Sequence, residues 1–458
     1  MTETEKMGTK GANKVTPRRD AQQPAANRLL GVYPQKQEGL FMQRIKIFGG
    51  RISWPQWRKI AQLATAYTPN TPLHLTTRQS IELHNVAGKD VPAIQQRLIE
   101  VALTVFGAGG DSLRNITICP GCGFDAASVD IFPLAQFVGW YLLSQPCILN
   151  LPRKFKISFS GCRTGCARPW LNDLGFIAQG DGKFTAIGAG SLGAKPSLGI
   201  ELYRDLAARD VTPLCVAAIE FFEQSGNREN RRRARFRHVR EKLGGQAFKK
   251  ELDVRFRQLK TSQTWPDISP ASRNKNIKLL WRLQLPNGNI SAAEAIQLAS
   301  AAEHKGAVLR INLEHGLELY GKETVQLPEM LARLESNPMI IACPGSTTCS
   351  KGIANTRETA DSIRYALAGQ HIPDVRINIS GCPNNCAHST VADIGLVGLR
   401  GRQEGKQIEC YRLFTGGGNG RNDRLSKESE ILCVRDVPGA VKGLVRTQMG
   451  RATQNSVM

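Results

Sequence analysis

The sequence has no apolar run long enough to cross a membrane, which takes roughly 18 residues or more. The longest apolar stretch, from Phe132 to Leu143, is shorter and contains Gln136. Residues 1–27 are polar and of mixed charge, without the apolar core of a secretory signal, and we interpret them as a disordered tail. We therefore expect a cytoplasmic protein that does not associate with membranes.

Acidic residues are few: 39 Asp and Glu stand against 61 Lys and Arg, a net charge of +22 over 458 residues. The composition is otherwise that of a globular protein and excludes collagen, a coiled coil and overall disorder. The positive charge predicts acidic partners or anionic ligands. It is densest over Gly226–Lys260, which we interpret as a solvated basic helix or as a surface for an acidic ligand or electron-donor protein. Nucleic acid is a weaker alternative, because the only aromatic residues in this segment are Phe236, Phe248 and Phe256.

Short motifs recur in the same order in the two halves of the chain, with little change in spacing, which indicates an internal duplication. Each copy opens with a helical pattern, and Ser291 with Glu294 predicts a capping box at the start of the second one. A strand-like stretch and then a longer α/β segment with cysteines follow. The paired stretches are Gly50–Ser53 with Gly288–Ser291, Leu73–Leu83 with Leu309–Leu319, Ile118–Gly121 with Ala342–Gly345, Phe159–Cys162 with Ile379–Cys382, and Asp173–Phe176 with Asp393–Leu396.

Cysteines of the second copy form two short pairs, Cys343-x5-Cys349 and Cys382-x3-Cys386. In a cytosolic chain, cysteines serve more often as metal ligands or free thiols than as disulfides. Four thiolates can hold a tetrahedral zinc ion or a [4Fe–4S] cluster. Small and amide-rich residues after a strand-like stretch would let backbone N–H groups point at sulfur, which is typical of a cluster. Zinc and metal-free buried cysteines remain alternatives.

These cysteines and three further motifs resemble the signature of the sirohaem-dependent sulfite and nitrite reductases. The motifs are Thr76-Thr77-Arg78-Gln79, Arg114-Asn115 and Leu151-Pro152-Arg153-Lys154-Phe155-Lys156, and the resemblance runs from about Gly31 to Leu444. It implies an internally duplicated α+β fold, with two ferredoxin-like half-domains and two larger α/β domains in a pseudo-twofold arrangement. The expected boundaries are a tail at 1–27, half-domains at 28–102 and 276–337, an anion-binding domain at 103–262, and a cluster and sirohaem domain at 338–450.

The resemblance also implies the cofactors and the site residues. Cys343, Cys349, Cys382 and Cys386 would hold one [4Fe–4S] cluster, with Cys386 bridging to the sirohaem iron. Arg44, Arg114, Lys154 and Lys156 would face a small oxyanion substrate, and Thr76, Thr77, Arg78, Gln79, Asn115, Asn227, Arg228 and Arg231 would contact sirohaem. Elementary chemistry agrees, because two lysines on one face of an extended segment repel each other unless an anion or an open cleft lies there. The second copy has Glu314-His315 where the first has Arg78-Gln79, so we expect the active site between the copies.

The expected activity is the six-electron reduction of sulfite to sulfide, with electrons from ferredoxin or a separate flavoprotein. Within the family, Lys154-Phe155-Lys156 favours sulfite over nitrite. Nitrite reduction to ammonia by the same site is the nearest alternative, followed by a monooxygenase of the precorrin-3B synthase type. A basic, zinc-containing nucleic-acid-binding protein represents a different class.

The first copy departs from the family pattern. It retains Cys119, Cys162 and Cys166 at positions that align with ligands of the second copy, while Asp125 occupies the fourth position and Cys122 is an extra neighbour. A second cluster on Cys119, Cys122, Cys162 and Cys166 is one interpretation. Structural cysteines left over from the duplication are the other, since the family places its cluster in the second copy.

Overall fold

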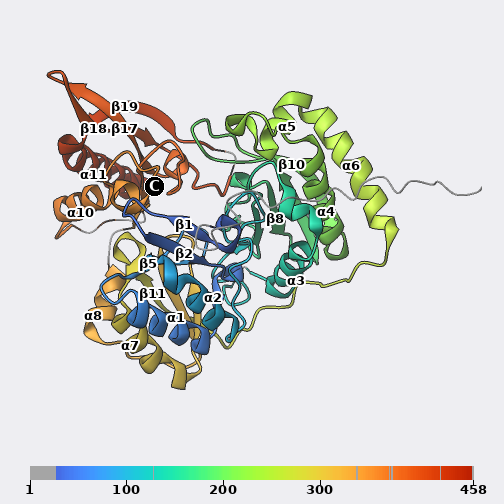
Figure 1. Cartoon of the computed structure of the whole chain (residues 1–458), viewed down its shortest axis with the longest axis horizontal. Coiled ribbons are helices and arrows are strands. Elements are labelled where there is room, and N and C mark those ends of the chain that lie inside the picture. Colours follow the sequence, from blue (N-terminus) through green and yellow to red (C-terminus); the bar gives the residue numbers. More distant parts are fainter. Residues whose placement is uncertain are drawn as a thin grey trace, which may run out of the picture.

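The computed structural model describes residues 27–455, except 127, 337–338, 371, 373–374 and 423. The predicted tail therefore lies, apart from Asn27, outside the described residues. Within them, the strands form sheets that occur in two related pairs, and no helix is both long and apolar enough to span a bilayer. Figure 1 shows the half-domains, in blue and yellow, side by side, with the larger first-copy domain in green and the second-copy domain in orange and red.

Each half-domain packs helices on an antiparallel sheet. The first consists of β1 (Val32–Pro34), β2 (Leu40–Ile45), β3 (Arg51–Ile52), α1 (Trp54–Tyr67), β4 (Leu73–Leu75), β5 (Ile81–Ala87) and α2 (Val91–Ile99). The second consists of β11 (Lys278–Gln284), β12 (Asn289–Ile290), α7 (Ala292–Ala302), β13 (Val308–Ile311), β14 (Gly316–Gly321) and α8 (Glu329–Ala332). The capping box predicted at Ser291 and Glu294 is confirmed, and Ser53 with Gln56 forms its counterpart in the first copy. Each capping box satisfies two backbone N–H groups that would otherwise lack hydrogen-bond partners at the start of the helix.

The half-domains exchange a short strand. Strand β3 of the first copy joins the second sheet beside β13, and β12 of the second copy joins the first sheet beside β4, in the orders β11-β14-β13-β3 and β1-β2-β5-β4-β12. Two indole groups reinforce the exchange, because Trp54 and Trp57 donate hydrogen bonds of 2.8 Å to the carbonyls of Ala307 and Ala295. One hydrophobic core runs through both half-domains as a result.

The two larger domains share one sheet topology. The first copy contains β6 (Thr117–Ile118), α3 (Phe132–Leu143), β7 (Ile157–Ser160), β8 (Leu174–Ala178), β9 (Lys183–Gly188), β10 (Ile200–Ala207), α4 (Ala208–Ser225), α5 (Phe236–Leu243) and α6 (Gly245–Ser262). The second contains β15 (Ile340–Ala342), α9 (Gly345–Thr348), α10 (Thr356–Leu367), β16 (Ile377–Ser380), β17 (Ile394–Gln403), β18 (Lys406–Thr415), β19 (Lys427–Cys433) and α11 (Val437–Asn455). In each, the first three strands run parallel and the last two antiparallel. The predicted duplicated α+β fold is confirmed.

The basic segment forms α5 and α6 against the first-copy domain. Its three aromatic side chains, Phe236, Phe248 and Phe256, are buried in the domain core, with exposed fractions of 0%, 0% and 5%. They cannot stack on bases, which is how aromatic residues serve most single-stranded nucleic-acid sites. The basic segment therefore offers a charged surface without exposed Phe236, Phe248 or Phe256 side chains to stack on bases.

Candidate active site between the two copies

The first part of the site is a pair of arginines around Tyr33. Arg44 on β2 lies directly opposite Glu82 on β5, and its guanidinium contacts that carboxylate at 2.7 and 2.8 Å. Arg114 donates to the Tyr33 hydroxyl at 3.3 Å, and the Arg44 guanidinium lies 5.2 Å from the centre of the Tyr33 ring. Both arginines also donate to the carbonyl of Ala108, at 3.2 and 3.5 Å. Although burial opposes ionisation of Tyr33, Arg114 and Arg44 lower its pKa below the ordinary value.

The two predicted lysines come directly before β7, in an extended segment. The Arg114 N–H donates to the carbonyl of Phe155 at 2.9 Å, so Arg114 lies alongside the residue between the lysines. Phe155 is fully buried, whereas Lys154 and Lys156 are partly exposed on the other side. Within the described residues, neither ammonium group has a hydrogen bond or an ion pair. Burial and the neighbouring Arg235 and Arg114 lower the pKa of Lys154 to about 7, and burial, Lys154 and Arg78 hold the pKa of Lys156 well below its ordinary value. An anion bound beside Lys154 and Lys156 would stabilise their charged forms.

The Thr76–Gln79 turn connects this site to both copies. Thr77 donates a hydrogen bond of 3.1 Å to the backbone carbonyl of Cys386, and Thr76 accepts from the N–H groups of Arg78 and Ser80. The Arg78 guanidinium donates to Asn172 at 2.9 Å and to the carbonyl of Ile157 at 2.8 Å.

The side chains of Gln79 and Asn115 fix the position of this turn through hydrogen bonds to backbone groups. The buried Gln79 amide donates to the carbonyls of Ile118 and Ile311 at 2.8 and 2.9 Å and accepts from the Ile118 N–H at 2.9 Å. Asn115 donates to the carbonyls of Ile47 and Arg78 at 2.6 and 2.9 Å. Their described contacts are therefore to backbone, which gives both residues a positioning role, while contact with sirohaem stays a prediction.

The second copy presents four cysteines to these cations. Cys386 is exposed and close enough to act electrostatically on Arg44, Lys154 and Lys156. It also acts on Cys343 and Cys382, and Cys382 in turn lies near Cys349. The folded chain thus brings together two groups of residues that are more than 180 positions apart in the sequence.

The four cysteines fit a [4Fe–4S] cluster. The N–H of Gly381 donates to Cys343 Sγ at 3.2 Å, and the backbone N–H groups of Gly345 and Asn384 serve Cys343 and Cys382. N–H groups aimed at sulfur stabilise negative charge on cluster ligands. Burial and the nearby Cys386 raise the pKa of Cys343 to about 12, so this thiol stays protonated at neutral pH unless a metal binds it. Cys386 is the ligand that faces the cations, and its role in joining the cluster to sirohaem stays a prediction.

Three predicted sirohaem contacts pair with protein groups at the surface. Asn227 caps the turn that follows it. Arg228 donates to Asn150 and Glu223, and Arg231 pairs with Asp111 at 2.7 Å. Their role toward sirohaem stays a prediction.

Sequence reasoning missed four residues of the site, including Tyr33. Arg235 pairs with the fully buried Asp173 at 2.8 Å, and the same carboxylate accepts the Lys156 N–H. His388 contacts Arg168 at 2.5 Å through Nδ1 and lies near Lys156. Lys46 is 1% exposed, donates to the carbonyl of Leu113 at 3.2 Å and lines a hollow of about 500 Å³. Arg235 could have been suspected from its basic segment, but the other three carry no local signal.

Comparisons with known proteins identify the family of the chain. Residues 109–260 and 337–456 match the family model described as nitrite and sulphite reductase 4Fe-4S domain, and residues 33–101 match the nitrite/sulfite reductase ferredoxin-like half domain. The assimilatory ferredoxin-dependent nitrite reductase of Haloferax mediterranei is 30% identical, over 91% of this chain and 80% of the relative. The ferredoxin–nitrite reductase of Synechococcus elongatus is 28% identical, over 90% of this chain and 87% of the relative.

The fold also has a solved counterpart. The structure of Mycobacterium tuberculosis NirA protein matches with a TM-score of 0.78 and 22% identity, covering 92% of this chain and 86% of that one. At that identity the match supports the fold alone. The family models and the relative that is 30% identical lead to one assignment: the chain belongs to the nitrite and sulphite reductase family of oxidoreductases, which use sirohaem and a [4Fe–4S] cluster.

Proposed function

We propose that this protein reduces nitrite to ammonium and takes its electrons from ferredoxin. The observation that carries the proposal is the pair of unpartnered lysines, Lys154 and Lys156, facing Cys386 between the two copies. The relatives named ferredoxin–nitrite reductases, which align with nearly the whole chain, support nitrite in place of the sulfite that the sequence favoured.

The charge of the site also supports nitrite. Lys154 and Lys156 lie beside Arg78, Arg114 and Arg235, and their lowered pKa values mean that the empty site carries less positive charge at neutral pH than its residue count indicates. Nitrite has a single negative charge, whereas sulfite near neutral pH carries up to two. A site with fewer charged groups matches the monoanion better, because a dianion would have to recruit further protons on binding.

Sirohaem and the cluster, when bound, supply an iron that takes the oxyanion and a path for single electrons. The chain's own residues orient the substrate and deliver protons. Arg44 is held in place by Glu82, and Arg114 by Tyr33 and Gly110, so both present rigid N–H groups to an anion. Lys154, with a pKa of about 7, can give a proton at Nζ and regain it from solvent, which suits a reaction that consumes protons.

His388 is a second group able to hold a proton near the site. Burial, Arg168 and Lys156 hold its pKa well below the ordinary value, so the imidazole is neutral. Its Nδ1 accepts from Arg168, which assigns the ring proton to Nε2. We assign His388 the role of a hydrogen-bond donor beside Lys156.

Sulfite remains the second candidate substrate, because Lys156 can take up a proton, which would favour an anion of higher charge. Holoenzyme assayed with reduced ferredoxin, and separately with reduced methyl viologen, tests both. We expect ammonium from nitrite at a higher kcat/KM than sulfide from sulfite. A higher kcat/KM for sulfite would contradict the proposal. We infer that ferredoxin docks on the basic surface of α5 and α6. Because salt weakens steering between surface charges, the rate with ferredoxin should fall as ionic strength rises, and a rate that is insensitive to salt would contradict this docking. The cytoplasmic location stays a prediction.

A further inference from the structure

The first copy contains four cysteines that the reductase site does not use. Cys119 follows β6, Cys122 lies three residues further on, and Cys162 and Cys166 follow β7. Strands β6 and β7 are parallel neighbours, so their carboxyl ends meet at one edge of the sheet. All four thiols are free of disulfides. The topology therefore gathers them in one place.

The four sulfurs contact one another in sequence. The Cys119 thiol lies in hydrogen-bonding contact with Cys122 and with Cys162, and Cys162 lies in similar contact with Cys166. Cysteine sulfurs gathered in this way can hold a metal ion or a metal cluster.

Backbone and hydroxyl groups are already aimed at these sulfurs. The N–H of Gly161 donates to Cys119 Sγ at 3.1 Å, and the N–H of Ile131 donates to Cys122 Sγ at 3.3 Å. The Thr164 hydroxyl lies 3.1 Å from both Cys162 Sγ and Cys166 Sγ. Donors that point at sulfur are what thiolate ligands of a cluster require.

The arrangement repeats the ligand set of the second copy. Cys119 corresponds to Cys343, and the Gly161 N–H on Cys119 corresponds to the Gly381 N–H on Cys343, at 3.1 and 3.2 Å. Both cysteine sets follow equivalent strands of equivalent sheets. The single departure is the fourth ligand: Cys122, three residues after Cys119, stands in for a cysteine at Asp125. Asp125 lies near Cys162 as well.

Two arginines compensate negative charge on these sulfurs. Arg310 of β13 is 5% exposed and lies near Cys122, and its Nη1 has no hydrogen-bond partner among the described residues. Arg421 of the second-copy domain lies near Cys166. A buried guanidinium nitrogen without a hydrogen-bond partner is costly unless negative groups lie close by. Asp130 is one such group near Arg310, and a cluster with four thiolates would add another.

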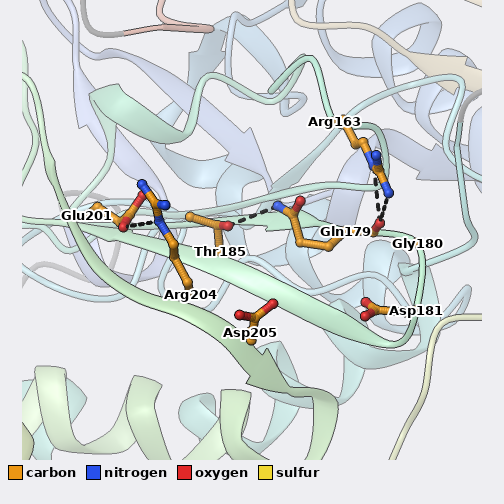
Figure 2. A pocket seen from close by; sticks show the side chains of 8 residues that line it. All are labelled: Arg163, Gln179, Gly180, Asp181, Thr185, Glu201, Arg204 and Asp205. Carbon is orange, nitrogen blue, oxygen red and sulfur yellow. Dashed lines mark hydrogen bonds and ion pairs between the residues drawn. The ribbon is translucent and has the colours of Figure 1, made fainter.

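A surface hollow lies beside the loop that connects Cys162 and Cys166, and Arg163 of that loop lines it. Figure 2 shows Arg163, the residue after Cys162, turned away along the sheet toward the carbonyl of Gln179, which it contacts at 2.6 and 3.1 Å. The hollow has a volume of about 660 Å³ and includes Arg204, Glu201 and Asp205 in its lining. Arg163 thereby ties the start of the loop between Cys162 and Cys166 to the sheet.

We propose that Cys119, Cys122, Cys162 and Cys166 bind a second [4Fe–4S] cluster. Binding breaks four S–H bonds, forms four Fe–S bonds and releases four protons to solvent, with no change in the oxidation state of sulfur. In the part of the chain that the structure describes, no three potential ligands gather as tightly as one metal ion requires, either here or at Cys343, Cys349, Cys382 and Cys386. The resemblance implies a [4Fe–4S] cluster for the second set, in which Cys343, Cys382 and Cys386 correspond to Cys119, Cys162 and Cys166.

The test is the metal content of the full-length holoenzyme, prepared anaerobically with sirohaem supplied. Two clusters and sirohaem predict about nine iron atoms per chain, against about five for one cluster. Cys122→Ser should lower the count to about five, remove one of two iron–sulfur signals in the Mössbauer spectrum and leave the sirohaem absorbance unchanged. Cys147→Ser, at a half-buried cysteine outside both sets, is the matched control and should change neither.

Each outcome of the iron count either supports or overturns the second cluster. About five iron atoms in the wild type would overturn the proposal, and one zinc per chain in addition would show that the four thiols hold a single ion. About nine iron atoms in both the wild type and Cys122→Ser would overturn the ligand assignment. If Cys122→Ser does not fold, the wild-type count and Mössbauer spectrum still decide. None of these measurements uses nitrite turnover, so failure here and failure of the proposed function are distinguishable.

Discussion

Replacing Lys156 with Asn removes one cation from the anion site while keeping a hydrogen-bond donor. In the described residues the Lys156 ammonium has no acceptor, and burial, Lys154 and Arg78 hold its pKa well below the ordinary value. An anion bound beside Lys156 raises that pKa again and therefore favours proton uptake by the amine. The mutation abolishes that proton uptake.

The expected loss follows from the type of bond. A hydrogen bond to a charged group contributes about 1.5–3 kcal/mol, but part of this is spent on protonating Lys156. We expect the lower end for sulfite, about 1.5 kcal/mol, or roughly a tenfold fall in kcat/KM. For nitrite the Asn amide replaces much of the interaction, so a loss of about 0.5–1 kcal/mol, or two- to fivefold, is expected.

Steady-state rates with reduced methyl viologen across the neutral pH range measure both effects. In the wild type, KM should rise with pH, because binding takes up a proton and deprotonated lysine becomes harder to charge. In Lys156→Asn this dependence should flatten. Lys156→Arg keeps the charge and is the matched control. Equal losses on both substrates with an unchanged pH profile would refute the reasoning and give Lys156 a role in general catalysis or in placing sirohaem.

Three other changes test the frame around the site. Cys386→Ser should abolish reduction of both substrates and lower cluster iron and sirohaem together; an unchanged visible spectrum would contradict the bridge. Glu82→Gln leaves the Arg44 guanidinium half-buried without its carboxylate and should destabilise the fold by about 3–5 kcal/mol at neutral pH. Burial opposes ionisation of Glu82, but Arg44 outweighs it and holds the Glu82 pKa well below the ordinary value. The stability that Glu82 adds is therefore present above its unfolded pKa and is lost as pH falls through its folded pKa, so urea midpoints of variant and wild type should converge in acid. Gly395→Ala should reduce cluster iron, since a Cβ there collides with the carbonyl of Ser389, close to Cys386; normal iron content would refute the close approach.

Local patterns were enough to predict much of the fold. Ser291 and Glu294 predicted a capping box because that motif depends on residues three positions apart. The repeated cysteine motifs predicted equivalent domains for the same reason. The strand exchange had no such signal, because β3 and β12 each contain two residues and pair with the other copy. Contacts between distant segments decide that pairing.

The residues of the site likewise divide into those that local motifs predict and those that only distant contacts reveal. Cys386, Lys154 and Lys156 lie in recognisable motifs, and the structure brings them together. Tyr33 and His388 do not, because their importance arises from Arg114 and Arg168, which reach them from far along the chain. In the proposed function, the preference for one oxyanion depends on how many cations of the site are charged at once, which a count of residues cannot express.

The exchanged strands also set the order in which the molecule can be completed as it is synthesised. Trp54 contacts Ala307, which lies 253 residues later. At about 5–20 residues per second, a ribosome needs roughly 13–50 s to produce that interval. During this time the first half-domain lacks β12 at its sheet edge, and α1 has no partner for its indole groups. An unpaired strand edge is a site of mispairing with other chains, so nascent chains of this protein should depend on chaperones until about residue 311 has emerged.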